Sequence, residues 1–189
     1  MVGVGALLLV IILPVFAAAK QKAKQTQCMS NLRQIGAALR LYADDNEGLL
    51  PPWRNRRHGG LPSESECNSP EQLRDILRSR TSDSKILFCD SDLYAHEDVD
   101  VLGINHKYSS YYYNLVLPSY RGALSVDGLL RAGRVIVPTG DYMLVRDANI
   151  GKKDTYKGKP AKGCSHFGGI NAVFLDWHAG WTAQEESDQ

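Results

Sequence analysis

Three side chains near the end of the chain, His166, Asp176 and His178, are of types that bind metal ions or exchange protons. Two imidazoles and one carboxylate suit zinc or iron. The pair Gly168-Gly169 would permit a hairpin that brings His166 and Asp176 together. The alternative is structural, with Asp176 capping a turn and bonding a nearby histidine. We favour the structural interpretation and keep the metal site as the less favoured one.

The same residues belong to an apolar run with a strand-like pattern. Residues 172–181 alternate well enough to form a strand, which would place Asp176 and His178 on one face with Phe174. Trp177 follows Asp176 where a tight left-handed turn would favour glycine. We therefore do not expect such a turn at Trp177.

Other patterns that suggest chemistry are sparse. An acidic stretch offers oxygen ligands for calcium, but it lacks the glycine and the terminal glutamate of an EF-hand loop. The acidic residues are Asp90, Asp92, Asp98 and Asp100. The chain has no nucleophile elbow, no H-E-x-x-H, no phosphate-binding loop and no dinucleotide fingerprint. We favour a solvated acidic loop over a calcium site here, and we expect no enzyme activity and no cofactor.

The four cysteines show no C-x-x-C spacing, which makes a zinc or thioredoxin-type site a poor interpretation. They are Cys28, Cys67, Cys89 and Cys164. Disulfides are the better interpretation, and a bond between Cys67 and Cys89 would close a modest loop. Four cysteines allow three pairings, and the spacing does not choose among them. Cys28 fits a buried free thiol equally well.

The charge balance limits the partners. The chain has 22 basic and 21 acidic residues, a formal net charge of +1. A near-neutral chain has no overall field that attracts nucleic acid. A local basic cluster with few aromatic neighbours favours a soluble loop tip, and its residues are Arg54, Arg56, Arg57 and His58. We expect no nucleic-acid partner.

The elements that must position these residues begin with an apolar segment. Residues 2–19 contain no charged or polar side chain. As a helix they would span about 27 Å, close to the thickness of a bilayer's hydrocarbon core. Ala17-Ala18-Ala19 also fits a cleaved secretory signal, but no basic residues precede the apolar core. We expect a retained segment that needs lipid or other helices around it, and the residues expected to make these contacts are Val4, Leu7, Leu8, Val10, Ile11, Pro14, Val15 and Phe16.

The helix is expected to continue to residue 46. Pro14 inside it removes one backbone hydrogen bond and predicts a kink. The second half is amphipathic, and the residues expected to pack on a head domain are Met29, Leu32, Ile35, Leu39 and Tyr42. Asn46, Gly48 and the Pro51-Pro52 pair are typical of a helix end. The sequence therefore predicts one long helix, apolar in its first half and amphipathic in its second.

Residues 47–189 are expected to form an α+β head. After a long loop, a short helix is expected at residues 69–80. Short β-type runs follow, at residues 85–89, 108–117, 134–137, 142–145 and 172–175. Their brevity favours a small antiparallel sheet packed on the amphipathic half of the helix.

Several motifs resemble those of type IV pilin-like and type II secretion pseudopilin-like proteins. They are the L-P-V-F-A-A-A-K run at residues 13–20, the C-M-S-N-L-R-Q-I-G run at residues 28–36 and the L-Y-A-D-D-N-E-G run at residues 41–48. His166, nine residues and then Asp176 resemble the prepilin-associated domain named for its His-x9-Asp-Gly pattern, with Trp177 in place of the glycine. The resemblance implies a pilin-like fold, with His166 and Asp176 tying a C-terminal turn to the sheet.

The resemblance also implies a function. The chain would be a structural subunit of an extracellular pilus-like or pseudopilus filament that assembles through its apolar helix. Its partners would be copies of itself in a helical homopolymer, the inner membrane before assembly, and the pilus or secretion machinery. The alternative is a membrane-anchored extracytoplasmic binding protein that does not polymerise, presenting its arginine cluster and its tyrosines to a ligand. The tyrosines are Tyr108, Tyr111, Tyr112 and Tyr113.

Overall fold

The computed structural model describes the backbone of the long helix and of most of the sheet. The described residues are 2–51, 73–74, 77–78, 84–92, 95–96, 100–101, 104–105, 109–113, 140–147, 155–156, 159–160, 166 and 169–183. At residues 2–9 and 11, and in the two-residue strands at 100–101, 104–105, 155–156 and 159–160, the description covers the backbone alone.

One helix, α1 (Val2–Asp45), makes up 44 residues of the chain and contains Pro14. It ends where the backbone enters the left-handed region, at Glu47 with φ 56° and Gly48 with φ 76°. The Gly48 amide donates to the Ala43 carbonyl over 2.8 Å, which satisfies one of the carbonyls left open at the helix end.

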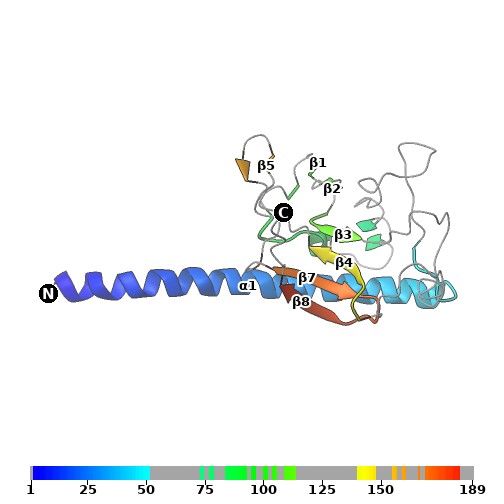
Figure 1. Cartoon of the computed structure of the whole chain (residues 1–189), viewed down its shortest axis with the longest axis horizontal. Coiled ribbons are helices and arrows are strands. Elements are labelled where there is room, and N and C mark those ends of the chain that lie inside the picture. The colour runs from blue at the N-terminus through cyan, green and yellow to red at the C-terminus, as the bar shows by residue number, and fades with distance from the viewer. Residues whose placement is uncertain are drawn as a thin grey trace.

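The two halves of α1 have different environments. Its first half projects beyond the head, whereas its second half runs along the head (Figure 1). Val10 and Phe16 are 71% and 69% exposed, while Leu32, Ile35 and Leu39 are fully buried. Within the part of the chain that the structure describes, no helix combines the length and the apolarity needed to cross a membrane.

The head contains a four-stranded antiparallel sheet in the order β3-β4-β7-β8. Its strands are β3 (Tyr111–Tyr113), β4 (Met143–Asp147), β7 (Gly169–Phe174) and β8 (Ala179–Ala183). Two short antiparallel pairs accompany it, β1 (Asp100–Val101) with β2 (Ile104–Asn105) and β5 (Thr155–Tyr156) with β6 (Lys159–Pro160). The α+β class with a long N-terminal helix is confirmed.

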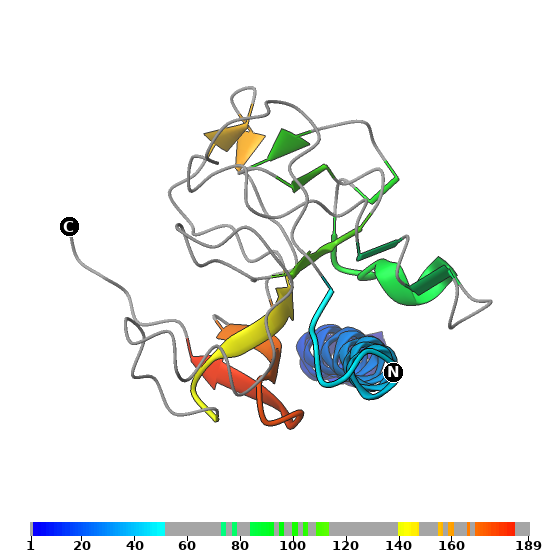
Figure 2. The ribbon, with the colours of Figure 1, turned by 90° about the vertical axis from the view of Figure 1, so that its right-hand side faces the viewer.

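The sheet and α1 enclose the core. Viewed along the helix axis, α1 lies beside the β4-β7-β8 part of the sheet (Figure 2). The helix contributes Leu32, Ile35 and Leu39 to the core cluster, and the sheet contributes Leu144 and Val173. Helix and sheet both bury one apolar face here, which is the packing that the amphipathic pattern predicts.

One expected strand is wrong. Residues 85–89 read as a β-type run, but η2 (Ser84–Leu87) is a 3-10 helix. Ile86 and Leu87 are both buried, and the Phe88 amide donates to the Lys85 carbonyl over 3.0 Å. This hydrogen bond joins residues three apart, which is the bond that closes a 3-10 turn. The strand expected at residues 134–137 lies outside the described residues.

Candidate functional site at the junction of helix and head

The junction between α1 and the head is closed by a disulfide. Cys28 lies on the buried face of α1, four residues before Leu32, and Cys89 follows η2. The two cysteines are bonded, and their Cα atoms are 5.5 Å apart. The expected pairing of Cys67 with Cys89 is therefore wrong, because the Cys89 sulfur is bonded to the Cys28 sulfur. Cys67 itself lies outside the described residues.

His166 approaches the same disulfide from the sheet side. It forms an isolated antiparallel bridge with Gly169, immediately before β7. Trp181 of β8 donates its indole N–H to the His166 carbonyl over 3.2 Å. A Cβ at Gly169 would collide with the Trp181 ring, so only glycine lets this ring lie against the bridge. The result is a buried imidazole whose Nε2 lies 3.3 Å from the Cys89 sulfur.

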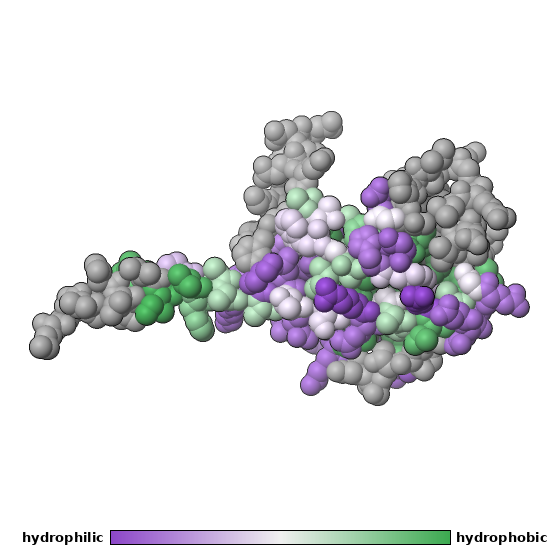
Figure 3. Space-filling model, turned by 90° about the horizontal axis from the view of Figure 1, so that it is seen from below, coloured by the Kyte–Doolittle hydropathy of each residue, from purple (hydrophilic) through white to green (hydrophobic). Residues whose placement is uncertain are grey.

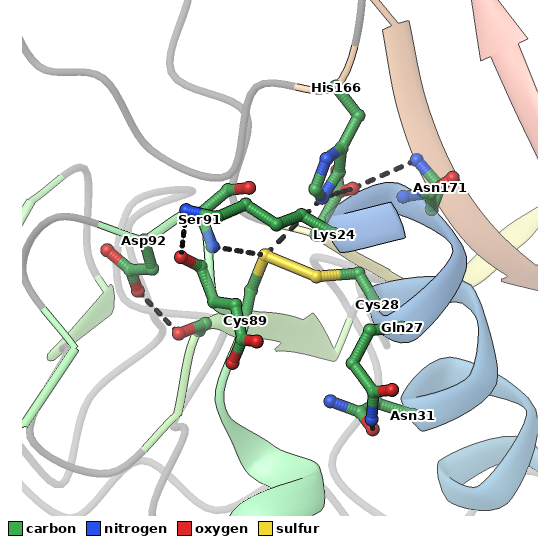
Figure 4. Close-up of a disulfide and its surroundings, with 12 residues drawn as sticks. Lys24, Gln27, Cys28, Asn31, Cys89, Ser91, Asp92, His166 and Asn171 are labelled. Carbon is green, nitrogen blue, oxygen red and sulfur yellow. Dashed lines mark hydrogen bonds and ion pairs between the residues drawn. A yellow bond between two sulfur atoms is a disulfide. The ribbon is translucent and has the colours of Figure 1, made fainter. Parts of the chain in front are cut away.

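Asp147 completes the cluster from the end of β4. Its Oδ2 lies 3.8 Å from the His166 Nε2, and both side chains are fully buried. The backbone N–H of Asn171 donates to the same oxygen over 3.1 Å, which fixes the carboxyl group. Figure 4 shows His166 above the disulfide, with Lys24 and Asn171 on either side. Four elements of the fold thus converge on one buried point.

Burial sets the protonation of this cluster. Burial raises the pKa of Asp147 to about 8, although the Asn171 backbone N–H opposes the shift. Burial lowers the pKa of His166 to about 4, and the charge of Lys24 adds to this shift. Both shifts favour the uncharged form of the side chain. Among the described residues, the Oδ1 of Asp147 and the Nδ1 of His166 are buried without a hydrogen-bond partner.

Hydrogen bonds reinforce the junction around the disulfide. The Asn31 amide donates to the Phe88 carbonyl over 3.0 Å and to the Tyr111 hydroxyl over 3.2 Å. Lys24 donates to the Asp90 carbonyl over 2.9 Å. The segment after η2 is therefore held to α1 by one covalent bond and two side-chain contacts, which fixes the head on the helix.

The expected tie between His166 and Asp176 is wrong, and so is the less favoured metal site of His166, Asp176 and His178. His166 lies before the first residue of β7, whereas Asp176 and His178 lie in the turn after its last residue. The Asp176 Oδ1 accepts the backbone N–H of His178 over 3.1 Å and pairs with its Nδ1 over 2.6 Å. This is the structural interpretation, in which Asp176 caps the turn, but His166 takes no part in it.

The single strand expected over residues 172–181 is also wrong, because the chain reverses at residues 175–178. Trp177 has φ 72°, so it adopts the left-handed conformation that we did not expect without glycine. Its amide donates to the Phe174 carbonyl over 2.9 Å, and its ring packs against the core cluster. The packing of the large ring offsets the conformational cost.

The residues expected to pack on the head lie on α1 as follows. Leu32, Ile35 and Leu39 are fully buried, and Met29 and Tyr42 are partly buried. Of the residues expected to mediate assembly, the exposed ones are Val10, Pro14, Val15 and Phe16. The side chains of Val4, Leu7, Leu8 and Ile11 lie outside the described residues, and the membrane or filament-core role of residues 2–19 stays a prediction.

The candidate ligand-binding features have mixed outcomes. Tyr111 and Tyr113 are buried in the core, and Tyr112 lies under the Arg146 guanidinium, 5.0 Å from its ring centroid. Asp92 accepts a hydrogen bond from the Ser110 hydroxyl. Asp90 is exposed. Tyr108, Asp98, Asp100 and the basic cluster of the loop lie outside the described side chains, and the calcium site stays a prediction.

Sequence reasoning missed the pairing of Cys28 and did not single out Asp147. The signal for Cys28 was present, because Cys28, Leu32 and Ile35 recur at helical spacing on the buried face. Comparisons of the chain with protein families, with curated proteins and with solved structures find no match.

Proposed function

We propose that this protein is a structural subunit that assembles with copies of itself into a pilus-like or pseudopilus filament through the first half of α1. The observation that carries the proposal is the exposed apolar surface on the projecting helix (Figure 3). Its described members are Val10, Ile12, Leu13, Val15 and Phe16, each 55% to 71% exposed. We call these five residues the apolar collar.

The geometry of the apolar collar favours several partners over one. At about 100° of rotation per residue, the five side chains point over about 220° of the circumference of α1. This is about twice the width of the stripe that an ordinary helix buries against its own domain. One flat partner surface cannot cover it, whereas neighbouring helices on several sides can.

The position of the head favours an open assembly. The collar lies on the part of α1 that projects beyond the head, so a helix from one copy can pack beside another with a lengthwise shift. Such a contact joins different surfaces of the two copies and generates a fibre when the rotation does not close. The disulfide and the core packing hold the head on the second half of α1.

The rival proposal is a membrane-anchored binding protein that does not polymerise. Two of its candidate ligand-contacting residues, Tyr111 and Tyr113, are buried in the core, which favours the filament proposal. In both proposals the chain acts outside the cytoplasm and without catalysis.

Electron microscopy of the full-length chain separates the two proposals. The chain is purified in detergent, the detergent is removed, and negatively stained samples are compared for the wild type, a Val15→Glu/Phe16→Glu variant and a Leu41→Glu variant. Leu41 is the matched control, because it is a 55% exposed apolar residue of α1 beside the head. We expect fibres from the wild type and from Leu41→Glu, and none from the double variant.

Two results would overturn the filament proposal. One is a wild type that never forms fibres and instead remains monomeric in lipid vesicles, which is the outcome expected of the rival. The other is a double variant that forms fibres as readily as the wild type, because the collar would then not be the assembly surface.

A further inference from the structure

The cluster at the junction contains side chains of the types that bind metal ions in addition to the two cysteines of the disulfide. The two cysteine sulfurs and one imidazole nitrogen of His166 all lie within 4.8 Å of one another, and all three residues are buried. Asp147 is not in this group of mutually close atoms, but its Oδ2 lies 3.8 Å from the His166 Nε2. Two sulfurs, one imidazole and one carboxylate are ligand types that tetrahedral zinc accepts.

We propose that the reduced chain binds one zinc ion at this point, through the thiolates of Cys28 and Cys89, the imidazole of His166 and the carboxylate of Asp147. The disulfide and the zinc site are then two alternative states of the same junction. The inference does not depend on filament assembly.

The spacing of the ligands supports a tetrahedral ion. With zinc bonds of about 2.3 Å to sulfur and about 2.0 Å to nitrogen or oxygen, neighbouring ligand atoms lie roughly 3.3 to 3.8 Å apart. The His166 Nε2 already lies 3.3 Å from the Cys89 sulfur and 3.8 Å from the Asp147 Oδ2. To bind zinc through all four ligands, the S–S bond must break, the two sulfurs must separate to the same spacing, and the Asp147 carboxyl group must move toward them.

Unpartnered buried atoms and charge support the site independently. Among the described residues, the Asp147 Oδ1 is buried without a hydrogen-bond partner, so this oxygen is available to an ion. The His166 Nδ1 also lacks a partner there, but the nitrogen that faces the Cys89 sulfur is Nε2. Two thiolates and one carboxylate bring three negative charges, of which zinc neutralises two. Lys24, on the same helix one turn before Cys28, supplies the remaining positive charge.

The conversion between the two states is balanced as follows. A dithiol reductant transfers two electrons and two protons to the disulfide, giving two thiols and the oxidised, cyclic form of the reductant. Binding of zinc then releases the two thiol protons and forms two Zn–S bonds. Asp147 and His166 contribute lone pairs, and any proton held by the carboxyl group is released as well.

Cobalt titration of the full-length, dithiol-reduced chain, in detergent without oxygen and after removal of the reductant, tests the site. Cobalt substitutes for zinc and gives intense visible bands when it is tetrahedral with thiolate ligands. We expect one cobalt per reduced chain with these bands, displacement by zinc, and no bands from the oxidised chain. We expect His166→Ala to weaken zinc binding more than about a hundredfold, because it removes a direct ligand.

The matched control is His178→Ala, because His178 is an exposed histidine already paired with Asp176. We expect this variant to bind zinc as the wild type does. Circular dichroism of each oxidised variant verifies folding, and Asp147→Asn provides a second variant that keeps the size of the side chain and is expected to change the cobalt bands. The proposal is overturned if the reduced wild type gives no thiolate bands, or if His166→Ala and Asp147→Asn both leave them unchanged.

Discussion

Gly36 of α1 faces Val173 of β7 so closely that a Cβ at Gly36 would lie 2.9 Å from the Val173 Cγ1. Val173 is itself buried, and its branched side chain has little freedom to move. The absence of a side chain at Gly36 thus sets how near the helix comes to the sheet.

We expect Gly36→Ala to destabilise the protein by about 1 kcal/mol. Overpacking costs about 1 to 3 kcal/mol, while the gain in helix propensity returns up to about 1 kcal/mol. Urea unfolding of the wild type, Gly36→Ala, Val173→Ala and the double variant measures the effect. A favourable coupling energy in the double variant is expected, since Val173→Ala removes the colliding methyl groups. Purely additive effects would contradict the contact.

The disulfide joins Cys28 and Cys89, which are separated by 61 residues in the chain, so its loss should lower the stability of the protein substantially. We expect a Cys28→Ser/Cys89→Ser variant to lose about 4 kcal/mol of stability, because the unfolded chain regains the entropy of a long loop. Chemical unfolding measures this loss, and peptide mapping without reduction should yield the linked pair. Cys67→Ser is the control, and an equal loss in that variant would point to the other pairing.

The left-handed backbone at Trp177 predicts that glycine is tolerated better than alanine at this position. Because Trp177 has φ 72°, we expect Trp177→Gly to be more stable than Trp177→Ala by about 1 kcal/mol. Both variants lose the packing of the indole ring on the core, so that loss cancels in the comparison. Thermal unfolding of the two variants gives the difference, and an alanine variant as stable as the glycine variant would rule out a left-handed residue here.

The pKa of Asp176 should lie below the ordinary value of an aspartate. Slight desolvation raises the pKa of Asp176, but the side-chain and backbone hydrogen bonds from His178 outweigh it and lower the pKa below 3.8. The folded turn thus gains stability that is fully present above the ordinary pKa and is lost as the pH falls through the folded one. Carboxyl NMR titration checks this.

The same titration of His178→Ala provides the control for Asp176. Removing the imidazole should move the pKa of Asp176 upward, toward the value of an unpaired aspartate. An unchanged pKa would show that the imidazole does not stabilise the carboxylate.

Local patterns predicted the elements that depend on neighbouring residues. The spacing of Leu32, Ile35 and Leu39 correctly identified the buried face of the helix, because helical periodicity places such residues in one row. Runs around Tyr111, Met143 and Ala172 correctly indicated short antiparallel strands. The capping of a turn by Asp176 was also predicted, since an aspartate bonds backbone groups two residues on.

The partners of the junction depend instead on residues far apart in the chain. Cys28 meets Cys89 and His166 only because α1, η2 and the start of β7 pack together, and cysteine spacing alone leaves three pairings open. Trp177 adopts the left-handed backbone conformation that favours glycine because its ring packs against the core. Through short-range periodicity, the sequence by itself thus determined the α+β head and the long helix, which is apolar in its first half and amphipathic in its second. The tertiary structure decided which buried cysteine, histidine and aspartate share one point, since long-range packing selects among contacts that local patterns leave equal.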